Sequence, residues 1–429
     1  MGDTFILALL GFKLVLLFIG FPIAFSAILI SLIYILAAGL PLSLAAQKVS
    51  FTVANFTLLA IPLFMFAGKL MTASGISDRI FDFAQKLVGR VPGGLGHVNV
   101  VSSLIFAGMS GSALADVAGL GEIEYKAMTR KGYDPDFTVG VTLSSSAIGP
   151  ILPPSLPMVL YGVASGTSIT GLFLGGVLPG LLIALMLMMF VFVIGLRRGY
   201  RIDIWEGWRA LLIAFIRALP PLFTPVIIVG GMAAGIFSPT EAATVTVLYA
   251  LFIAVIVYRE LNWRGFATVV YEVVISTSKL LFIIATALLL GWILTVEQVP
   301  QRIAEFTATT ITDPTTFWIS VLALMLVLGA IIENAMLLLI LAPMLAPIAE
   351  SQFGIDPIQF GVCMVFSVMI GQYTPPIGLS LFVMRGITGF SLGRVSWAVA
   401  PFLLPLVLSL LVMAMVPSII LSIPKSLGF

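Results

Sequence analysis

Four strings rich in glycine, proline and small polar residues interrupt the apolar stretches of this chain. They are Gly108-Met-Ser110-Gly111-Ser112, Gly149-Pro150-Ile-Leu-Pro153-Pro154, Gly329-Ala-Ile-Ile-Glu333-Asn334 and Gly371-Gln372-Tyr373-Thr374-Pro375-Pro376. Proline lacks an N–H and frees the carbonyl four residues earlier, and glycine permits left-handed turns, so each string releases several main-chain oxygens at one point. Hard cations are bound by oxygen ligands. The strings therefore predict binding sites for Na⁺.

The strings fall into two pairs, and each pair forms one candidate Na⁺ site. The first site comprises Ser110, Ser112, Ser145, Gly149 and Pro150, and the second comprises Glu333, Asn334, Gly371 and Thr374. The alternative is that the strings are proline kinks and packing contacts of small residues, which are common between membrane helices. Breaks at four related positions favour ion sites over independent kinks, although they leave the individual ligand atoms open.

Carboxylates inside apolar segments are further candidates, because an ionisable group near the bilayer centre costs about 2.5–3.5 kcal/mol on insertion scales. Asp116 lies one helical turn after Ser112, and Glu333 lies in the equivalent string of the second half. Each could hold a cation or carry a proton, or could cap a half-helix amino terminus. Neither has an evident carboxylate neighbour within its membrane segment for a proton relay, which favours Na⁺ over H⁺ as the coupling ion.

The substrate candidates are side chains and backbone groups near the first two strings and one arginine after the last. They are Ser110, Asp116, Pro154 and Arg385. Arg385 could bind a substrate carboxylate, but a cytoplasmic anchor at a helix end is the simpler interpretation of this residue.

Composition decides the class of fold that must position these residues. Of 429 residues, 60% are hydrophobic and 9% are charged, whereas a soluble domain has about 45–50% apolar and about 25% charged residues. The chain is therefore expected to be an all-α polytopic membrane protein in a lipid bilayer. One cysteine, one histidine and a net charge of +2 argue against disulfide frameworks, Cys/His metal sites and nucleic-acid binding. No cofactor other than Na⁺ is expected.

Two other classes of function can be weighed from the sequence. Gly108-Met-Ser110-Gly111 matches the GxSG string of rhomboid-type intramembrane proteases, but the single histidine, His97, would lie roughly 20 Å away along the same helix. A serine nucleophile needs a base within hydrogen-bond reach, so the chain is not expected to be an enzyme. An ion channel would require a continuous polar pore helix or a charged ring, and the sequence indicates neither.

An internal duplication organises the chain, because Gly132-Tyr-Asp-Pro135 matches Gly354-Ile-Asp-Pro357 and the same register aligns Pro153-Pro154 with Pro375-Pro376. Repeat 1 is predicted at 1–196, with a hairpin at about 95–131 and a broken helix at about 136–165. A cytoplasmic connector follows at 197–210. Repeat 2 is predicted at 211–429, with an amphipathic arm at about 258–276, a hairpin at about 315–350 and a broken helix at about 357–385. Scaffold helices complete each repeat.

Charge favours copies of opposite orientation. Arg197, Arg198 and Arg201 place the connector in the cytoplasm by the positive-inside rule. The segment 126–131 is basic, whereas its counterpart at 348–357 contains acids and no lysine or arginine. Opposite charge in equivalent loops is expected of inverted repeats, as in many secondary transporters, although loop composition could produce it by chance. The expected fold is thus two inverted repeats with re-entrant helical hairpins and broken transmembrane helices.

Five strings spread over almost the whole chain resemble the large membrane (M) subunit of tripartite ATP-independent periplasmic (TRAP) transporters. They are Gly20-Phe-Pro22-Ile-Ala-Phe, Ile61-Pro62-Leu-Phe-Met-Phe-Ala67-Gly68, Gly108-Met-Ser110-Gly111-Ser112-Ala-Leu-Ala-Asp116, Ile151-Leu-Pro153-Pro154-Ser155 and Gly235-Ile-Phe-Ser238-Pro239-Thr240-Glu241-Ala-Ala. The third and fifth strings are specific, and the others are supportive.

The resemblance implies a multi-pass protein of the bacterial inner membrane, driven by a Na⁺ gradient and moving its substrate by an elevator mechanism. It also implies two partners, a small four-helix membrane subunit (Q type) and a soluble periplasmic binding protein (P type) that delivers an organic acid. The small subunit is expected to be a separate chain, because this sequence begins directly with the large one. The overall similarity leans toward the sialic-acid branch, whose solute is N-acetylneuraminate, and C4-dicarboxylate carriers share the same motifs.

Overall fold

All regular structure in the described part of the chain is helical. The computed structural model describes residues 3–200, 204–376 and 378–429, and these contain no strand. Helices satisfy every backbone group within one segment, as lipid requires. Seven stretches of the described residues are helices long and apolar enough to cross a membrane.

The helices of the first half end at the connector. They are α1 (Asp3–Phe18), α2 (Ile23–Ala37), α3 (Ser43–Val53), α4 (Ala60–Ala73), α5 (Ile76–Val88), α6 (Gly94–Ser110), α7 (Ala113–Gly119), α8 (Gly121–Arg130), α9 (Pro135–Ser145), α10 (Leu156–Ser165) and α11 (Ile169–Arg198), with 3-10 turns at Phe56–Leu59 and Ser146–Ile148. The connector then leads into α12, and its Arg201 lies outside the described residues.

The second half contains the longest helix of the described residues, which has 34 residues. It contains α12 (Trp208–Ala233), α13 (Pro239–Phe252) with a π-helical turn at Ile253–Val257, α14 (Trp263–Val296), α15 (Val299–Thr310), α16 (Pro314–Gly329), α17 (Asn334–Phe353), α18 (Pro357–Gly371), α19 (Leu379–Thr388), α20 (Leu392–Met415) and α21 (Ser418–Ser426). We call α6–α8 the first hairpin, α16–α17 the second hairpin, α9–α10 the first broken helix and α18–α19 the second broken helix.

The duplicated sequence produces duplicated helix starts. The Asp134 side chain caps α9, the Asp356 side chain caps α18, and a proline follows each of them as the first helical residue. After the two broken helices, Ser168 caps α11 and Ser391 caps α20 in the same way. Such caps satisfy backbone N–H groups that have no partner within the helix, so equivalent sequence positions begin equivalent helices.

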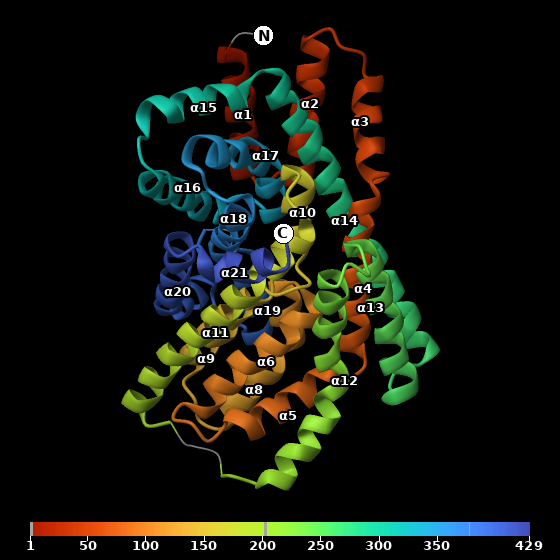
Figure 1. Ribbon diagram of the computed structural model, residues 1–429, viewed down its shortest axis with the longest axis vertical. Helices are drawn as coiled ribbons and strands as arrows, with labels where there is room; N and C mark the ends of the chain where they lie inside the picture. The colour runs from red at the N-terminus through yellow and green to blue at the C-terminus, as the bar shows by residue number, and fades with distance from the viewer. Residues whose placement is uncertain (1–2, 201–203, 377) are drawn as a thin grey trace.

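The two hairpins approach the centre of the molecule from opposite sides. Figure 1 shows α6 and α8 in the lower half of the view and α16 and α17 in the upper left. The long helix α14 runs along the right side. The broken helices exchange partners between the halves, because α10 packs on α17 and α19 packs on α7. This is the placement expected of inverted repeats, and it confirms the predicted fold class.

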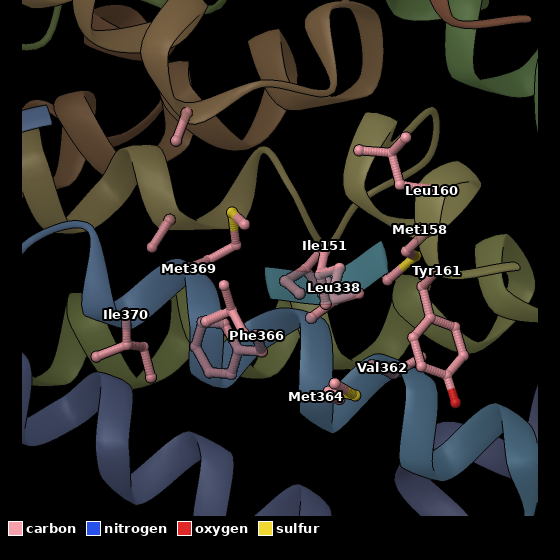
Figure 2. Packing of buried hydrophobic residues seen from close by; sticks show 14 of the residues in the cluster. Ile151, Met158, Leu160, Tyr161, Leu338, Val362, Met364, Phe366, Met369 and Ile370 are labelled. Atoms are coloured by element: carbon pink, nitrogen blue, oxygen red, sulfur yellow. The ribbon is translucent and has the colours of Figure 1, made fainter. Parts of the chain in front are cut away.

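The core surrounds the second broken helix. Figure 2 shows Phe366, Met369 and Ile370 of α18 near Ile151 and Leu338, which come from the first broken helix and the second hairpin. Phe366 is fully buried, and so are its neighbours along α18 from Phe360 to Val365. A helix that is buried on all sides has a continuously apolar sequence, as α18 does.

One predicted boundary is wrong. The amphipathic arm at 258–276 is not a separate element, because α14 continues from Trp263 to Val296 and this stretch contains no proline to end it. Between α3 and α4, the Asn55 side chain accepts a hydrogen bond from the Thr57 N–H at 3.0 Å. This local cap starts the turn that leads into α4.

Candidate ion and substrate site

The tips of both hairpins line one cavity of about 340 Å³, which we call the central cavity. Its polar lining consists of Ser112 from the first hairpin, Glu333 and Asn334 from the second, Gln372 from the second broken helix, and Ser276 and Lys279 from α14. Apolar side chains such as Met65, Leu338 and Met369 form the rest of the wall. A mostly apolar cavity with a few convergent polar groups is typical of a site for a small ligand.

The first hairpin breaks at Gly111 and Ser112, directly beside the break in the first broken helix. The Ser112 hydroxyl caps α7 by accepting a hydrogen bond from the Ala115 N–H at 3.4 Å. A Cβ added at Gly149 would lie 3.3 Å from the carbonyl carbon of Ser112, and Pro150 lines the central cavity with Ser112. The structure therefore brings together three members of the first predicted site, whose role in binding Na⁺ stays a prediction.

The other two serines of this site are in different situations. Ser110 is buried, its hydroxyl has no hydrogen-bond partner among the described residues, and it lines a smaller cavity of about 160 Å³ that adjoins the central one. The Ser145 hydroxyl lies 2.7 Å from Asn99 Oδ1 and accepts a hydrogen bond from the Ser103 hydroxyl at 3.1 Å. Ser110 thus has hydrogen-bonding capacity for a ligand, whereas that of Ser145 is largely used within the protein.

The second hairpin breaks between Ala330 and Glu333, and its tip contacts the second broken helix. A Cβ added at Gly371 would lie 2.5 Å from the carbonyl carbon of Gly329. Such a close approach of the two backbones requires glycine at both positions. Thr374 follows the break, and its hydroxyl donates back to a carbonyl of α18 at 3.3 Å. The four breaks predicted from glycine and proline are therefore confirmed.

Two side chains of the second tip make different hydrogen bonds. Glu333 caps α17, because its Oε2 accepts a hydrogen bond from the Met336 N–H at 3.0 Å. Asn334 donates through Nδ2 to Gln372 Oε1 at 3.1 Å. Both side chains line the central cavity with Gln372. The capping interpretation offered for Glu333 is thus realised, and the oxygens of Asn334 and Gln372 are the uncharged ligands available at this tip.

A chain of hydrogen bonds joins the two broken helices. Gln372 Nε2 donates to the Tyr373 hydroxyl at 3.4 Å, and the Tyr373 hydroxyl lies 2.9 Å from the Ser146 hydroxyl. Through Asn334, the same chain reaches the tip of the second hairpin. Buried polar groups therefore link the second predicted site to Ser146, the residue that follows Ser145 of the first predicted site. Such networks rigidify a structure when all of their members are satisfied.

Three predicted substrate residues do not line the central cavity. Asp116 is 1% exposed and lies behind the first tip, and the Pro154 carbonyl packs against Gly111. Arg385 is exposed on α19 and is absent from the described residues that line the central cavity. The fourth candidate, Ser110, lines only the adjoining smaller cavity. Residues near a break in sequence need not face the space that the break creates, because helix direction decides where a side chain points.

Asp116 has an acidic neighbour, contrary to the prediction that none lies nearby. Glu124 of α8 is 1% exposed and interacts electrostatically with Asp116. Both oxygens of Asp116 and Oε1 of Glu124 lack hydrogen-bond partners among the described residues. The predicted absence of a second carboxylate near Asp116, which favoured Na⁺ over H⁺ in the sequence, is therefore wrong, and the identity of the coupling ion stays a prediction.

Sequence reasoning missed Lys279, Gln372 and Glu124. A charge near the start of the apolar stretch 277–297 was a usable signal for Lys279, and Gln372 stood inside one of the four strings. Glu124 gave no such signal, because it lies in a segment with several other charges. Its burial follows only from the packing of α8 against α9.

The fold and the cavity together define a polytopic helical membrane protein with two opposed hairpins around one small-ligand site. A solved structure with a similar fold is that of the Alcanivorax borkumensis YdaH transporter, with a TM-score of 0.57 at 16% identity, covering 85% of this chain and 86% of that one. At this identity the likeness concerns the fold alone.

Sequence comparison gives the family. The family model of the tripartite ATP-independent periplasmic transporter, DctM component, matches residues 10–419. The sialic acid TRAP transporter large permease protein SiaM of Vibrio cholerae is 43% identical, over 96% of each chain. The sialic acid TRAP permease SiaT of Haemophilus influenzae is 38% identical over 100% of this chain and 69% of that protein. The C4-dicarboxylate TRAP large permease DctM of Pseudomonas aeruginosa is 39% identical over 89% of this chain and 90% of that one.

The chain belongs to the TRAP transporter family and is a large permease component. This confirms the resemblance found in the sequence strings. The relatives are named as transporter permeases and not as enzymes, which agrees with the interpretation of Gly108-Met-Ser110-Gly111 as a hairpin tip.

Proposed function

We propose that this permease imports an organic acid across the bacterial inner membrane, driven by the Na⁺ gradient. The observation that carries the proposal is the shared cavity, because Ser112 and Asn334 come from opposite hairpins and line the same space. The first tip supplies serine hydroxyls and the second tip supplies the Asn334 amide, each beside main-chain oxygens where a helix is broken. Na⁺ bound at each tip would lend positive charge to the cavity and so favour an anionic solute.

The substrate proposed first is N-acetylneuraminate, with a C4-dicarboxylate as the alternative. Support for the first comes from the identity to the sialic acid permeases, and support for the second comes from the similarly high identity to DctM. The proposed partners are a small four-helix membrane subunit and a periplasmic binding protein that delivers the acid. Purified subunits in liposomes should take up labelled N-acetylneuraminate, and not succinate, only with an inward Na⁺ gradient. The reverse preference would assign the alternative substrate.

Variants at the tips test the ion sites. Ser112→Ala and Asn334→Leu should raise the Na⁺ concentration for half-maximal uptake at least several-fold, whereas Ser112→Thr keeps the hydroxyl and should remain close to the parent. Ser396→Ala is a matched control, because that hydroxyl only donates to a carbonyl within α20. Unchanged Na⁺ dependence in both tip variants would reject the assigned sites.

For the movement, we propose that the hairpins and broken helices slide together past α1–α4 and α12–α14. A disulfide between these groups should therefore stop transport. A Cβ added at Gly119 of α7 would lie 3.6 Å from Thr72 Cγ2 of α4, close enough for the pair Thr72→Cys and Gly119→Cys to be bridged. Oxidation should abolish uptake and reduction should restore it, with each single variant as control. Full uptake by the oxidised pair would exclude an elevator at this boundary. The native Cys363 is buried and does not compete.

A further inference from the structure

The cavity-facing side of α14 carries a polar stripe. Glu272, Ser276 and Lys279 follow one another at intervals of three to four residues, which places them on one face of the helix. Ser276 and Lys279 line the central cavity, together with Leu280 and Ile283 from the same face. The stripe lies in an otherwise apolar helix that is long enough to span a membrane, where charged residues are rare and usually functional.

The two lysines near the cavities differ in their partners. Lys69 of α4 borders the smaller cavity, and its ammonium is neutralised by Glu272 at 2.8 Å. No carboxylate in the described part of the chain pairs with Lys279. Glu333 is the one acid among the described residues that line the central cavity, and it is used in capping α17. Lys279 therefore has no ion-pair partner among the described residues, and it lines this space together with one acidic side chain, Glu333.

Lys279 is an exposed residue near the middle of the 34-residue helix α14. Either end of this helix is about 25 Å away at about 1.5 Å per residue. Lys279 also lines the same cavity as both hairpin tips, which places it at their depth. An ionisable side chain at this depth usually marks a functional site.

We propose that Lys279 binds the carboxylate of the transported acid and is the cationic specificity residue of the permease. Lys279 is the one cation among the described residues that line the central cavity. Its compact charge suits a single carboxylate, and Ser112, Asn334 and Gln372 remain for hydroxyl and amide groups of the solute. Arg385, the sequence candidate for this task, lies elsewhere. The inference rests on the proposed function, because it takes the solute to be an organic acid.

The position of Lys279 has a consequence for the transport cycle. α14 lies outside the hairpins and broken helices that the proposed movement carries, whereas Ser112 and Asn334 lie on them. The ammonium would then meet the carboxylate in only one of the two end positions. Affinity for the acid would fall as the hairpins move away, and this fall assists release.

Direct binding to the purified permease tests the inference separately from transport. N-acetylneuraminate and succinate are titrated with wild type, Lys279→Gln, Lys279→Arg and the control Lys48→Gln, whose lysine sits over the Trp292 ring at 5.2 Å, away from the cavity. Elution as a single species in size-exclusion chromatography verifies folding of each variant. Lys279→Gln should weaken binding of the acid at least tenfold, Lys279→Arg should retain part of it, and Lys48→Gln should match wild type.

The outcomes separate the two proposals. Binding that is weakened in Lys279→Gln supports the inference even if liposomes show no Na⁺-driven uptake, a result that would reject only the proposed function. Equal affinity of wild type and Lys279→Gln overturns the inference even if uptake is Na⁺-driven. Failure of wild type to bind either acid overturns both. In liposomes, Lys279→Gln should raise the KM for the acid and leave half-saturation by Na⁺ unchanged, whereas an equal change in both would indicate a merely structural role.

Discussion

The hydroxyl groups of Ser146 and Tyr373 lie 2.9 Å apart, although 227 positions separate the two residues in the chain. Each stands at the break of a different broken helix, so this contact ties the two copies together at the level of the candidate ion sites. Tyr373 is completely buried, and a buried hydroxyl that loses its partner remains desolvated without compensation.

Removing the Tyr373 hydroxyl should weaken the junction between the copies. Tyr373→Phe deletes the bond to Ser146 and the contact with Gln372, and the expected loss of unfolding free energy is about 1–2 kcal/mol. Thermal unfolding in detergent measures it. A double-mutant cycle with Ser146→Ala should show a coupling of about 1 kcal/mol. Additive effects of the two variants would mean that the hydroxyls do not interact in the protein.

The positions of the helix breaks could be predicted from sequence, because their causes are local. Clusters of proline, glycine and small polar residues end the helices at the four strings, whereas single prolines such as Pro179 lie inside continuous helices. The Asp-Pro pairs at Asp134 and Asp356 start the next helix by capping. The contact between Ser146 and Tyr373 could not be predicted, because it depends on how two distant helices pack. The arm at 258–276 was predicted wrongly for a related reason, since an amphipathic pattern does not show whether the following apolar segment continues the same helix.

Gly371 tests the close approach of the second hairpin to its broken helix. An added methyl group would overlap the Gly329 backbone, and overpacking of this kind costs about 1–3 kcal/mol. Gly371→Ala should therefore lower the melting temperature and reduce uptake. Gly386→Ala is the matched control in α19, because a Cβ there meets nothing within 4 Å, and it should leave stability unchanged or slightly higher. Equal effects of both changes would refute the packing argument.

Gly111 has both a positive φ and a close backbone contact, whereas Gly132 has a positive φ without such a contact. Gly111 has φ +59°, and an added Cβ would overlap the Pro154 carbonyl oxygen; Gly132 has φ +82° with open space around it. Alanine at either position should cost about 1–2 kcal/mol for the backbone conformation. Only Gly111→Ala should also displace the first tip and abolish Na⁺-driven uptake. Comparable uptake by the two variants would indicate that the contact with Pro154 has no role in transport.

The residues that line the candidate site were harder to predict than the positions of the helix breaks. Ser112, Gly149 and Asn334 lie at the breaks themselves, and the structure places them where the sequence suggested. Asp116 lies only one helical turn further along, and that turn carries its side chain into the protein interior, beside Glu124 and away from the cavity. Lys279 belongs to a helix distant in sequence from either tip. Its approach to the cavity depends on the packing of α14 against α17, which no local pattern encodes.

Asp313 gives a prediction for pH dependence at the start of the second hairpin. It caps α16 by accepting hydrogen bonds from the Thr316 hydroxyl at 2.6 Å and the Thr316 N–H at 2.8 Å. These bonds, the hydroxyl first, lower the pKa of the Asp313 carboxyl from its usual value of 3.8. A carboxyl whose pKa is lower in the folded state contributes stability above its unfolded pKa and loses that contribution as pH falls through the folded value.

Asp313→Asn removes this titration while keeping a side chain that can cap the helix. The difference in melting temperature between wild type and Asp313→Asn should thus be constant from pH 8 to about 5 and shrink as the pH falls below about 4. Differential scanning fluorimetry in detergent across this range measures it, and subtracting the variant cancels the other carboxyls of the chain. A difference that stays the same down to pH 3 would show that the charge of Asp313 does not stabilise the start of α16.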